Sequence, residues 1–180
     1  STSLLRKWYV VPTAIILLLM ALWLGIKTQP ETALSYLIKA ETNLEVCCSL
    51  GLMSLEHLKE LKAAGLDRCH PNLESAASHF ENIVSTHSYQ DEVKSVQNAK
   101  EAGLHVCVGG VFGMGETFQQ RVELAFDIRD LKTDSFPINF LKRLKGTRLD
   151  NYALMNYYEA LRTIALLRLV LPKIDLFVCG

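Results

Sequence analysis

The sequence predicts an α/β protein, a partial TIM-type (β/α) barrel of about five parallel strand–helix units, preceded by a hydrophobic N-terminal helix. Short apolar runs alternate with longer helical segments five times, which is typical of a parallel sheet with right-handed crossovers. Helices close on Ala-Gly before the next apolar run, at Ala64-Gly65 and Ala102-Gly103. A complete (β/α)8 barrel needs about 200 residues or more. Five units would therefore leave open edge strands.

The leading helix is predicted from an uncharged run between Trp8 and Ile26. Its length matches the ~30 Å hydrocarbon core of a bilayer. Arg6 and Lys7 precede the run and Lys27 follows it, so we predict a single-pass membrane helix with a cytoplasmic N-terminus. A signal peptide or a buried core helix would be the alternatives. The expected domains are this helix in residues 1–30 and the partial barrel in residues 31–180.

The elements of the barrel follow from caps and apolar runs. Ser54 and Thr117 are N-cap residues, Gly65 and Gly103 close helices, and Pro172 ends the last helix. The expected helices cover residues 31–40, 54–64, 89–102, 117–131 and 152–171. The expected strands cover residues 44–47, 66–69, 104–109, 135–141 and 175–179.

Composition excludes some function classes. Nineteen basic and nineteen acidic residues cancel, so charge gives no case for nucleic acid as a partner. The five cysteines contain no Cys-x2-Cys pair and no spacing typical of a disulfide framework. Buried free thiols are one interpretation of them. A soft metal or cluster shared by Cys47 and Cys107, at the ends of two strands, is the other.

In a β/α barrel the functional residues lie at the carboxyl ends of strands. A glycine-rich segment, residues 109–116, follows one such end and could let a ligand approach the backbone. It is neither a Walker loop nor Gly-x-Gly-x-x-Gly, so a tight turn remains the alternative. Four histidines are expected to be solvated: His57, His79, His87 and His105. The other strand ends carry Cys47, Cys48, Ser49, His70, Asn72, Glu74, Cys107, Asn139 and Cys179.

From about Leu44 to its end the chain resembles biotin synthase, a radical S-adenosylmethionine (SAM) enzyme. The motifs that carry the resemblance occur in order at residues 44–51, 64–68, 70–75, 106–117, 136–139, 145–147 and 162–165. The resemblance implies sulfur insertion into dethiobiotin, with SAM and iron–sulfur clusters as cofactors. It implies Cys47 and Cys107 as auxiliary-cluster ligands, and Asn72 and Asn139 beside the substrate. The residues it implies for SAM are Asn72, Glu74, Gly109, Val111, Gly113 and Glu116. It assigns no catalytic residue.

The departures from the family are also informative. The sequence contains no Cys-x3-Cys-x2-Cys spacing, which in the family holds the radical-generating cluster. Family arginines correspond to Phe177 and Glu92, a family asparagine to His70 and a family histidine to Pro71. We therefore expect that this chain alone forms no 5′-deoxyadenosyl radical.

Three hypotheses follow. The chain is the C-terminal part of a biotin-synthase-like enzyme, inactive as it stands. Alternatively, it is a membrane-anchored, non-catalytic partial barrel that binds a ligand or protein partner. As a third option, an unrelated leader is joined to an enzyme fragment. A homo-oligomer or a missing N-terminal half would cover the open edges. The family resemblance implies a cytoplasmic location as the alternative to the membrane.

Overall fold

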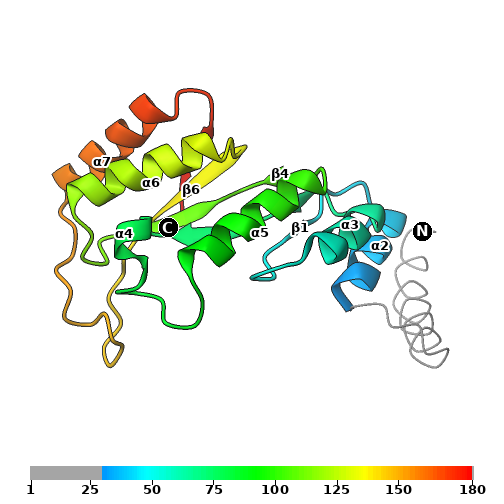
Figure 1. Ribbon diagram of the computed structural model, residues 1–180, viewed down its shortest axis with the longest axis horizontal. Helices are drawn as coiled ribbons and strands as arrows, with labels where there is room; N and C mark the ends of the chain where they lie inside the picture. Colours follow the sequence, from blue (N-terminus) through cyan, green and yellow to red (C-terminus); the bar gives the residue numbers. More distant parts are fainter. Residues whose placement is uncertain (1–29, 180) are drawn as a thin grey trace, which may run out of the picture.

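The computed structural model describes residues 30–179, in which strands and helices alternate along the chain (Figure 1). All strand pairs are parallel. One sheet has the order β1-β2-β4 and the other has the order β3-β5-β6-β7. The strands are β1 (Cys47–Cys48), β2 (Arg68–Cys69), β3 (Asn72–Glu74), β4 (His105–Val106), β5 (Gly109–Phe112), β6 (Ser135–Phe140) and β7 (Asp175–Val178).

The two sheets are halves of one wall. β2 continues into β3 after only His70 and Pro71, and β4 continues into β5 after Cys107 and Val108. A bridge between Cys107 and Ser135 joins the halves across the second interruption. The chain therefore runs through about five strand positions, as predicted, and two of these positions are interrupted.

Four helices begin within one residue of where the sequence predicts them. The Ser54 hydroxyl accepts a hydrogen bond from His57 N, and Thr117 forms a capping box with Gln120. Ser88 forms a second capping box with Asp91. These side chains satisfy amide groups that the first helical turn leaves without partners. The four helices are α2 (Pro30–Glu41), α3 (Leu55–Ala63), α5 (Tyr89–Glu101) and α6 (Phe118–Asp130), and the other described helices are α4 (Ala77–Phe80) and α7 (Tyr157–Val170).

Several boundaries differ from the prediction. The first strand, expected at residues 44–47, is β1 (Cys47–Cys48), and the strand expected at 104–109 is divided into β4 and β5. α7 begins at Tyr157 rather than at 152, because the side chain of Asn156 caps it by accepting from Glu159 N. The short helix α4 was not predicted; its Phe80 is fully buried and packs edge-on against Tyr89 of α5. Tertiary packing thus supports a helix of one turn that local propensity would not hold alone.

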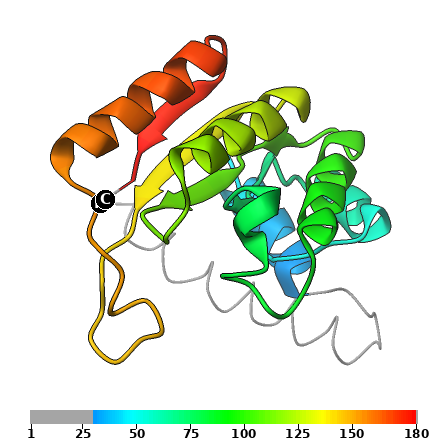
Figure 2. The ribbon, with the colours of Figure 1, turned by 60° about the vertical axis from the view of Figure 1, so that its left-hand side comes forward.

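The core lies between the strands and the helices that cover one of their faces. Figure 2 shows α6 and α7 running beside β6 and β7. Phe112 and Phe136 meet edge to face at 6.3 Å between ring centroids. The fully buried apolar side chains around them include Leu58, Leu61, Leu66, Leu73, Val96, Val106, Val108, Leu124, Ile128, Ile138 and Leu167. The helix-covered face is therefore apolar, and the other face, here called the inner face, is left for polar groups.

β1 and β7 are the outer strands of this wall, whose halves have the orders β1-β2-β4 and β3-β5-β6-β7. On β7, Phe177 and Val178 are 45% and 56% exposed. The predicted partial barrel is confirmed in these residues, and its edge strands are open as expected. The predicted leading helix between Trp8 and Ile26 lies outside the described residues.

Candidate functional site

The inner face can be assigned from two adjacent glycines of β5. A Cβ added to Gly110 would meet Leu124 of α6 at 3.1 Å, so this position faces the helices. A Cβ added to Gly109 would instead meet Asn72 Oδ1 at 2.5 Å and His70 Nε2 at 3.2 Å. Because side chains alternate along a strand, Val111 shares the inner face with Gly109. Strand β5 thus carries the helix-covered core on one side and the candidate site on the other.

The two asparagines predicted beside a substrate are both attached to β5. Asn72 Oδ1 accepts a hydrogen bond from Gly109 N at 3.2 Å. Asn139 is the register partner of Val111, and its Nδ2 donates to Gly110 O at 3.4 Å. Strand pairing therefore brings Asn72, Val111 and Asn139, which are far apart in sequence, to one region of the inner face. A side chain at position 109 would displace the amide group of Asn72, because its Cβ would lie 2.5 Å from Asn72 Oδ1.

Glu74 ends β3 in a strained conformation, with φ of 60°. Burial raises the pKa of its carboxyl group, and a hydrogen bond from Asn72 opposes the rise. The nearby Glu92 raises that pKa further and His87 lowers it. Glu92 is itself buried, and its Oε1 lies 2.6 Å from His87 Nε2. The carboxyl end of β3 is therefore surrounded by two carboxyl groups and one imidazole.

Cys47 and Cys107 also lie along this wall, but in a different setting. Burial raises the pKa of the Cys47 thiol; the thiols of Cys107 and Cys48 act in the same direction and Arg68 opposes them. Burial likewise raises the pKa of Cys107, against a hydrogen bond with Ser135. Cys107 directly follows β4, in the interruption between β4 and β5. The chain then continues along the wall through β5 to Phe112, so Cys107 lies farther from the carboxyl edge of the wall than the glycine-rich segment does.

One strand, β2, separates Cys47 from Cys107 in the sheet order. The backbones of the strands that carry the two thiols are thus about 10 Å apart, twice the usual strand spacing. Within residues 30–179, no group of three or more histidine, cysteine, aspartate or glutamate side chains is placed to hold a metal ion. These residues do not by themselves fit an iron–sulfur cluster, which needs more thiolate ligands.

Glu116 organises the turn that follows β5. Its carboxylate accepts from Gly113 N at 2.9 Å and from Met114 N at 2.8 Å. It also accepts from Arg121 Nε at 2.8 Å, and its side chain is only 2% exposed. Gly113 has φ of +92°, which favours glycine at this position of the turn. A cofactor contact of Glu116 stays a prediction; the geometry assigns its oxygens to the turn and to Arg121.

Sequence reasoning missed the fixed positions of two histidines, of which one is buried and the other half-buried. His79 is buried, and its Nε2 lies 3.1 Å from Met114 O in the same turn. His87 is held between Phe80 and Glu92. The expectation that both are solvated is wrong. His79 is held by Met114, which is distant in sequence, and His87 is held by Glu92 of α5. No spacing in the sequence marks these contacts.

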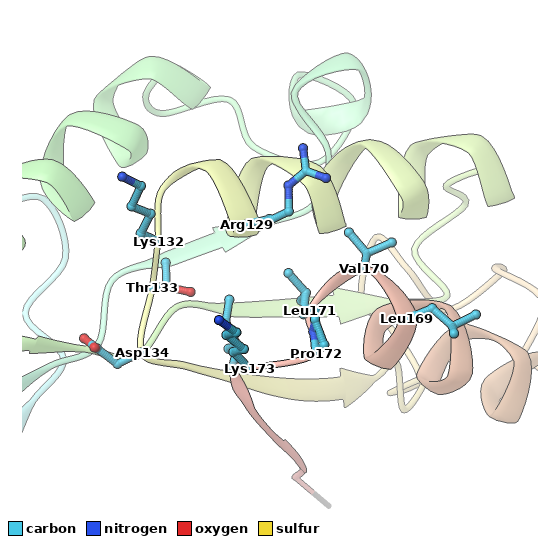
Figure 3. A pocket seen from close by; sticks show the side chains of 10 residues that line it. Arg129, Lys132, Thr133, Asp134, Leu169, Val170, Leu171, Pro172 and Lys173 are labelled. Carbon is cyan, nitrogen blue, oxygen red and sulfur yellow. The ribbon is translucent and has the colours of Figure 1, made fainter.

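A cavity of about 540 Å³ lies elsewhere, between the carboxyl ends of α6 and α7 (Figure 3). Arg129, Thr133, Asp134, Leu171 and Lys173 are among the residues that line it. The cavity is at the amino ends of β6 and β7, away from Asn139. Because barrel enzymes use the carboxyl ends of their strands, we do not place the candidate site there.

Comparisons with known proteins agree with this architecture. The family model of the radical SAM superfamily matches residues 19–128, and that of the Biotin and Thiamin Synthesis associated domain matches residues 137–180. Biotin synthase of Citrifermentans bemidjiense is 49% identical over 143 residues, covering 79% of this chain and 44% of that protein. Biotin synthase of Thermotoga petrophila is 49% identical over 136 residues, covering 76% and 46%. The chain thus spans less than half the length of these relatives.

Solved structures share the fold at lower identity. Methylornithine synthase superposes with a TM-score of 0.73 at 21% identity, over 81% of this chain and 43% of that chain. The FeFe-hydrogenase maturase of Carboxydothermus hydrogenoformans superposes with a TM-score of 0.69 at 17% identity, over 84% and 40%. The fold class predicted from the sequence is therefore that of radical SAM barrels.

The membrane assignment needs correction. The superfamily match already begins at residue 19, inside the apolar run that we predicted to be a membrane helix. Between residues 30 and 179, moreover, no helix has the length and apolar character needed to cross a bilayer. The predicted single-pass membrane location is therefore wrong: the apolar run overlaps a segment that aligns with the barrel family.

Proposed function

Because the chain belongs to the radical SAM superfamily and corresponds to the C-terminal part of biotin synthase, we propose that it supplies the substrate side of a sulfur-insertion barrel. The substrate we propose is dethiobiotin, which carries a cyclic urea. The observation that supports this most directly is the position of Asn72 and Asn139, both tied to β5 on the inner face. Side-chain amides have the donors and acceptors that a cyclic urea requires.

The hydrogen bonds to β5 would hold the two asparagine side chains in one orientation before substrate binds. Such preorganisation lowers the entropy cost of binding. Val111, half-buried between them on the strand, would add an apolar contact. We propose that Val111 and the backbone of the Gly109–Phe112 strand hold the adenosyl part of SAM. Bound SAM supplies the 5′-deoxyadenosyl group that the family's chemistry needs.

We do not propose that this chain alone carries out the iron–sulfur cluster chemistry of the family. Cys47 and Cys107 are separated by β2, and the 180-residue sequence contains no Cys-x3-Cys-x2-Cys spacing. We therefore propose that the chain by itself makes no biotin. In this proposal its own residues bind and orient the substrate, and radical formation depends on cluster ligands outside this sequence.

A chimera tests the substrate proposal. Residues 44–180 would replace the matching part of Citrifermentans bemidjiense biotin synthase, and biotin would be measured after addition of SAM, dethiobiotin and a reductant. We expect biotin from the chimera and none from the 180-residue chain. In the chimera, Asn139→Ala should reduce kcat/KM about tenfold or more, because it removes a substrate contact worth about 1.5 kcal/mol or more.

Two results would contradict the proposal. Biotin formation by the 180-residue chain alone would contradict its inactivity. A chimera that holds its iron–sulfur clusters but does not bind dethiobiotin would contradict the assigned substrate. Iron content and absorbance of the chimera, measured before the assay, show whether the clusters are in place.

A further inference from the structure

Two cysteines face each other across the first two strands. Cys48 of β1 and Cys69 of β2 are register partners in the parallel pair. Neighbouring strands lie about 4.8 Å apart, which is within the 4.4–6.8 Å Cα separation of disulfides. Register partners carry their side chains on the same face of a sheet, and each thiol shifts the pKa of the other, lowering that of Cys48 and raising that of Cys69. The two thiols therefore face each other, and both cysteines are free.

No other pair of cysteines meets these conditions, and all five lie in the described part of the chain. Cys47 and Cys107 have β2 between them, and Cys107 and Cys179 have β6 between them. Neither pair lies on adjacent strands, and the backbones of strands with one strand between them are about 10 Å apart, beyond the Cα separation of a disulfide. The side chain of Cys47 lies on the opposite face of the sheet from that of Cys48, because consecutive side chains on a strand alternate between the two faces.

The pair lies on the helix-covered face and not in the candidate site. Cys69 is part of the apolar core, at 3% exposure, and Cys48 packs against that core. Cys48 is half-buried and Cys69 is buried, so Cys48 is the more accessible cysteine of the pair. The cysteines that the family resemblance assigns to a cluster, Cys47 and Cys107, have no part in this arrangement.

We propose that Cys48 and Cys69 form a reversible redox site, which closes to a cross-strand disulfide on reaction with a low-molecular-weight disulfide such as oxidised glutathione. The Cys48 thiolate attacks one glutathione sulfur, a Cys48–glutathione bond forms, and one glutathione thiolate leaves. The Cys69 thiolate then attacks the Cys48 sulfur and releases the second glutathione. The protein loses two electrons and two protons, and one oxidised glutathione becomes two reduced molecules.

The bond would link β1, a short edge strand of the described sheet, to β2. β1 is two residues long and pairs with β2 through Cys47–Arg68 and Cys48–Cys69 alone. A covalent link at one of these two positions would hold the strand to its neighbour when the backbone hydrogen bonds open. Reduction would return the strand to hydrogen bonding alone.

Disulfide mapping tests this proposal. The full chain would be incubated anaerobically with oxidised glutathione, blocked with iodoacetamide and digested with trypsin without reduction. We expect one cross-linked species that joins the peptide of residues 40–59 to the peptide that begins at Cys69. Its fragment spectrum should show carbamidomethyl on Cys47 and the cross-link on Cys48. Treatment with dithiothreitol should release both peptides.

Cys47→Ser is the matched control, since it removes the neighbouring thiol and should leave the cross-link in full yield. Cys48→Ser should abolish it. The proposal is overturned if the wild-type chain forms no 48–69 cross-link while Cys48 carries glutathione. It is also overturned if the cross-link persists in Cys48→Ser, which would show that Cys47 is the reacting thiol. Both measurements use covalent products, so they do not depend on enzymatic activity.

Discussion

At the scale of single residues, the Glu116–Arg121 pair connects the candidate site to the body of the protein. Glu116 binds two amides of the turn after β5, and Arg121 continues to Glu159 at 2.8 Å and to Thr163 Oγ1 at 3.2 Å on α7. Arg121 is 5% exposed, so its charge is removed from water and depends on these partners. Through this chain of contacts, the turn that follows Val111 is fixed to both α6 and α7.

Glu116→Gln should therefore destabilise the protein by about 3 kcal/mol, because it leaves a buried guanidinium without its buried partner. Urea unfolding followed by circular dichroism measures the loss. Glu159→Gln is the matched control: Glu159 is 42% exposed and binds the same arginine. It should cost less than about 1 kcal/mol, because water can replace an exposed partner. Equal losses in the two variants would contradict the assigned role of Glu116.

At the scale of elements, two aspartates make the same kind of contact. Each precedes one strand and accepts a hydrogen bond from a backbone amide at the strand beside it. Asp67 precedes β2, and its Oδ2 accepts from Val46 N at 2.7 Å beside β1. Asp134 precedes β6 and accepts from Val106 N of β4, also at 2.7 Å. Asp67 additionally pairs with Lys39 of α2 at 2.9 Å. The side chain at the start of one strand thus holds the backbone of the strand beside it.

Acid should weaken the Asp67 contact in a defined direction. The hydrogen bond from Val46 N, followed by that from Lys39, lowers the pKa of Asp67 below its usual value. A lowered folded-state pKa stabilises the protein above the unfolded-state pKa of about 3.9, and this contribution is lost as the pH falls through the folded-state value. Asp67→Asn should cost about 1 kcal/mol at pH 7, and this cost should shrink as the pH falls below about 4.

Urea unfolding of Asp67→Asn and the wild type at a series of pH values checks this expectation. Asp130→Asn is a suitable control, since Asp130 is exposed and pairs only with its neighbour Arg129 among the ion pairs of residues 30–179. It should leave stability unchanged across the series. A cost for Asp67→Asn that is independent of pH would show that the lost contact is not ionic in origin.

At the scale of the whole molecule, the parallel wall is open at β1 and β7. Its helix-covered face holds a complete core, with fully buried side chains from Leu58 on α3 to Leu167 on α7. In a closed barrel, the remaining strands would cover the inner face. This chain spans less than half the length of its relatives, and the strands described here do not close around that face. The described strands therefore hold the site residues in place. Whether the site is closed off from solvent depends on what covers the two edge strands.

We expect that the 180-residue chain binds no stoichiometric four-iron cluster after anaerobic reconstitution with iron and sulfide. Its two candidate ligands, Cys47 and Cys107, are separated by a strand, and two thiolates are too few for such a cluster. Iron analysis and absorbance near 400 nm are the measurements, with a full-length biotin synthase reconstituted in parallel. A redox-active cluster at one per chain, lost in Cys107→Ser, would refute this prediction.

The sequence by itself determined the order and the limits of most elements, because the signals involved are local. Ser54 and Thr117 cap helices through amides three residues away, and Gly65 and Gly103 adopt positive φ after α3 and α5. Family resemblance added the inner-face residues Asn72, Val111 and Asn139, whose common location the strand register supports.

Only the tertiary structure decided the contacts made between distant segments. The Cys48–Cys69 pair joins residues 21 apart, and the pairing of Arg121 with Thr163 spans 42 residues. Burial of His79 likewise depends on the turn at Met114. Local propensity is set by a few neighbouring residues, whereas these contacts depend on strand register and on how helices pack against the sheet. A periodic pattern identifies a strand, but it does not tell which residue of the next strand lies opposite.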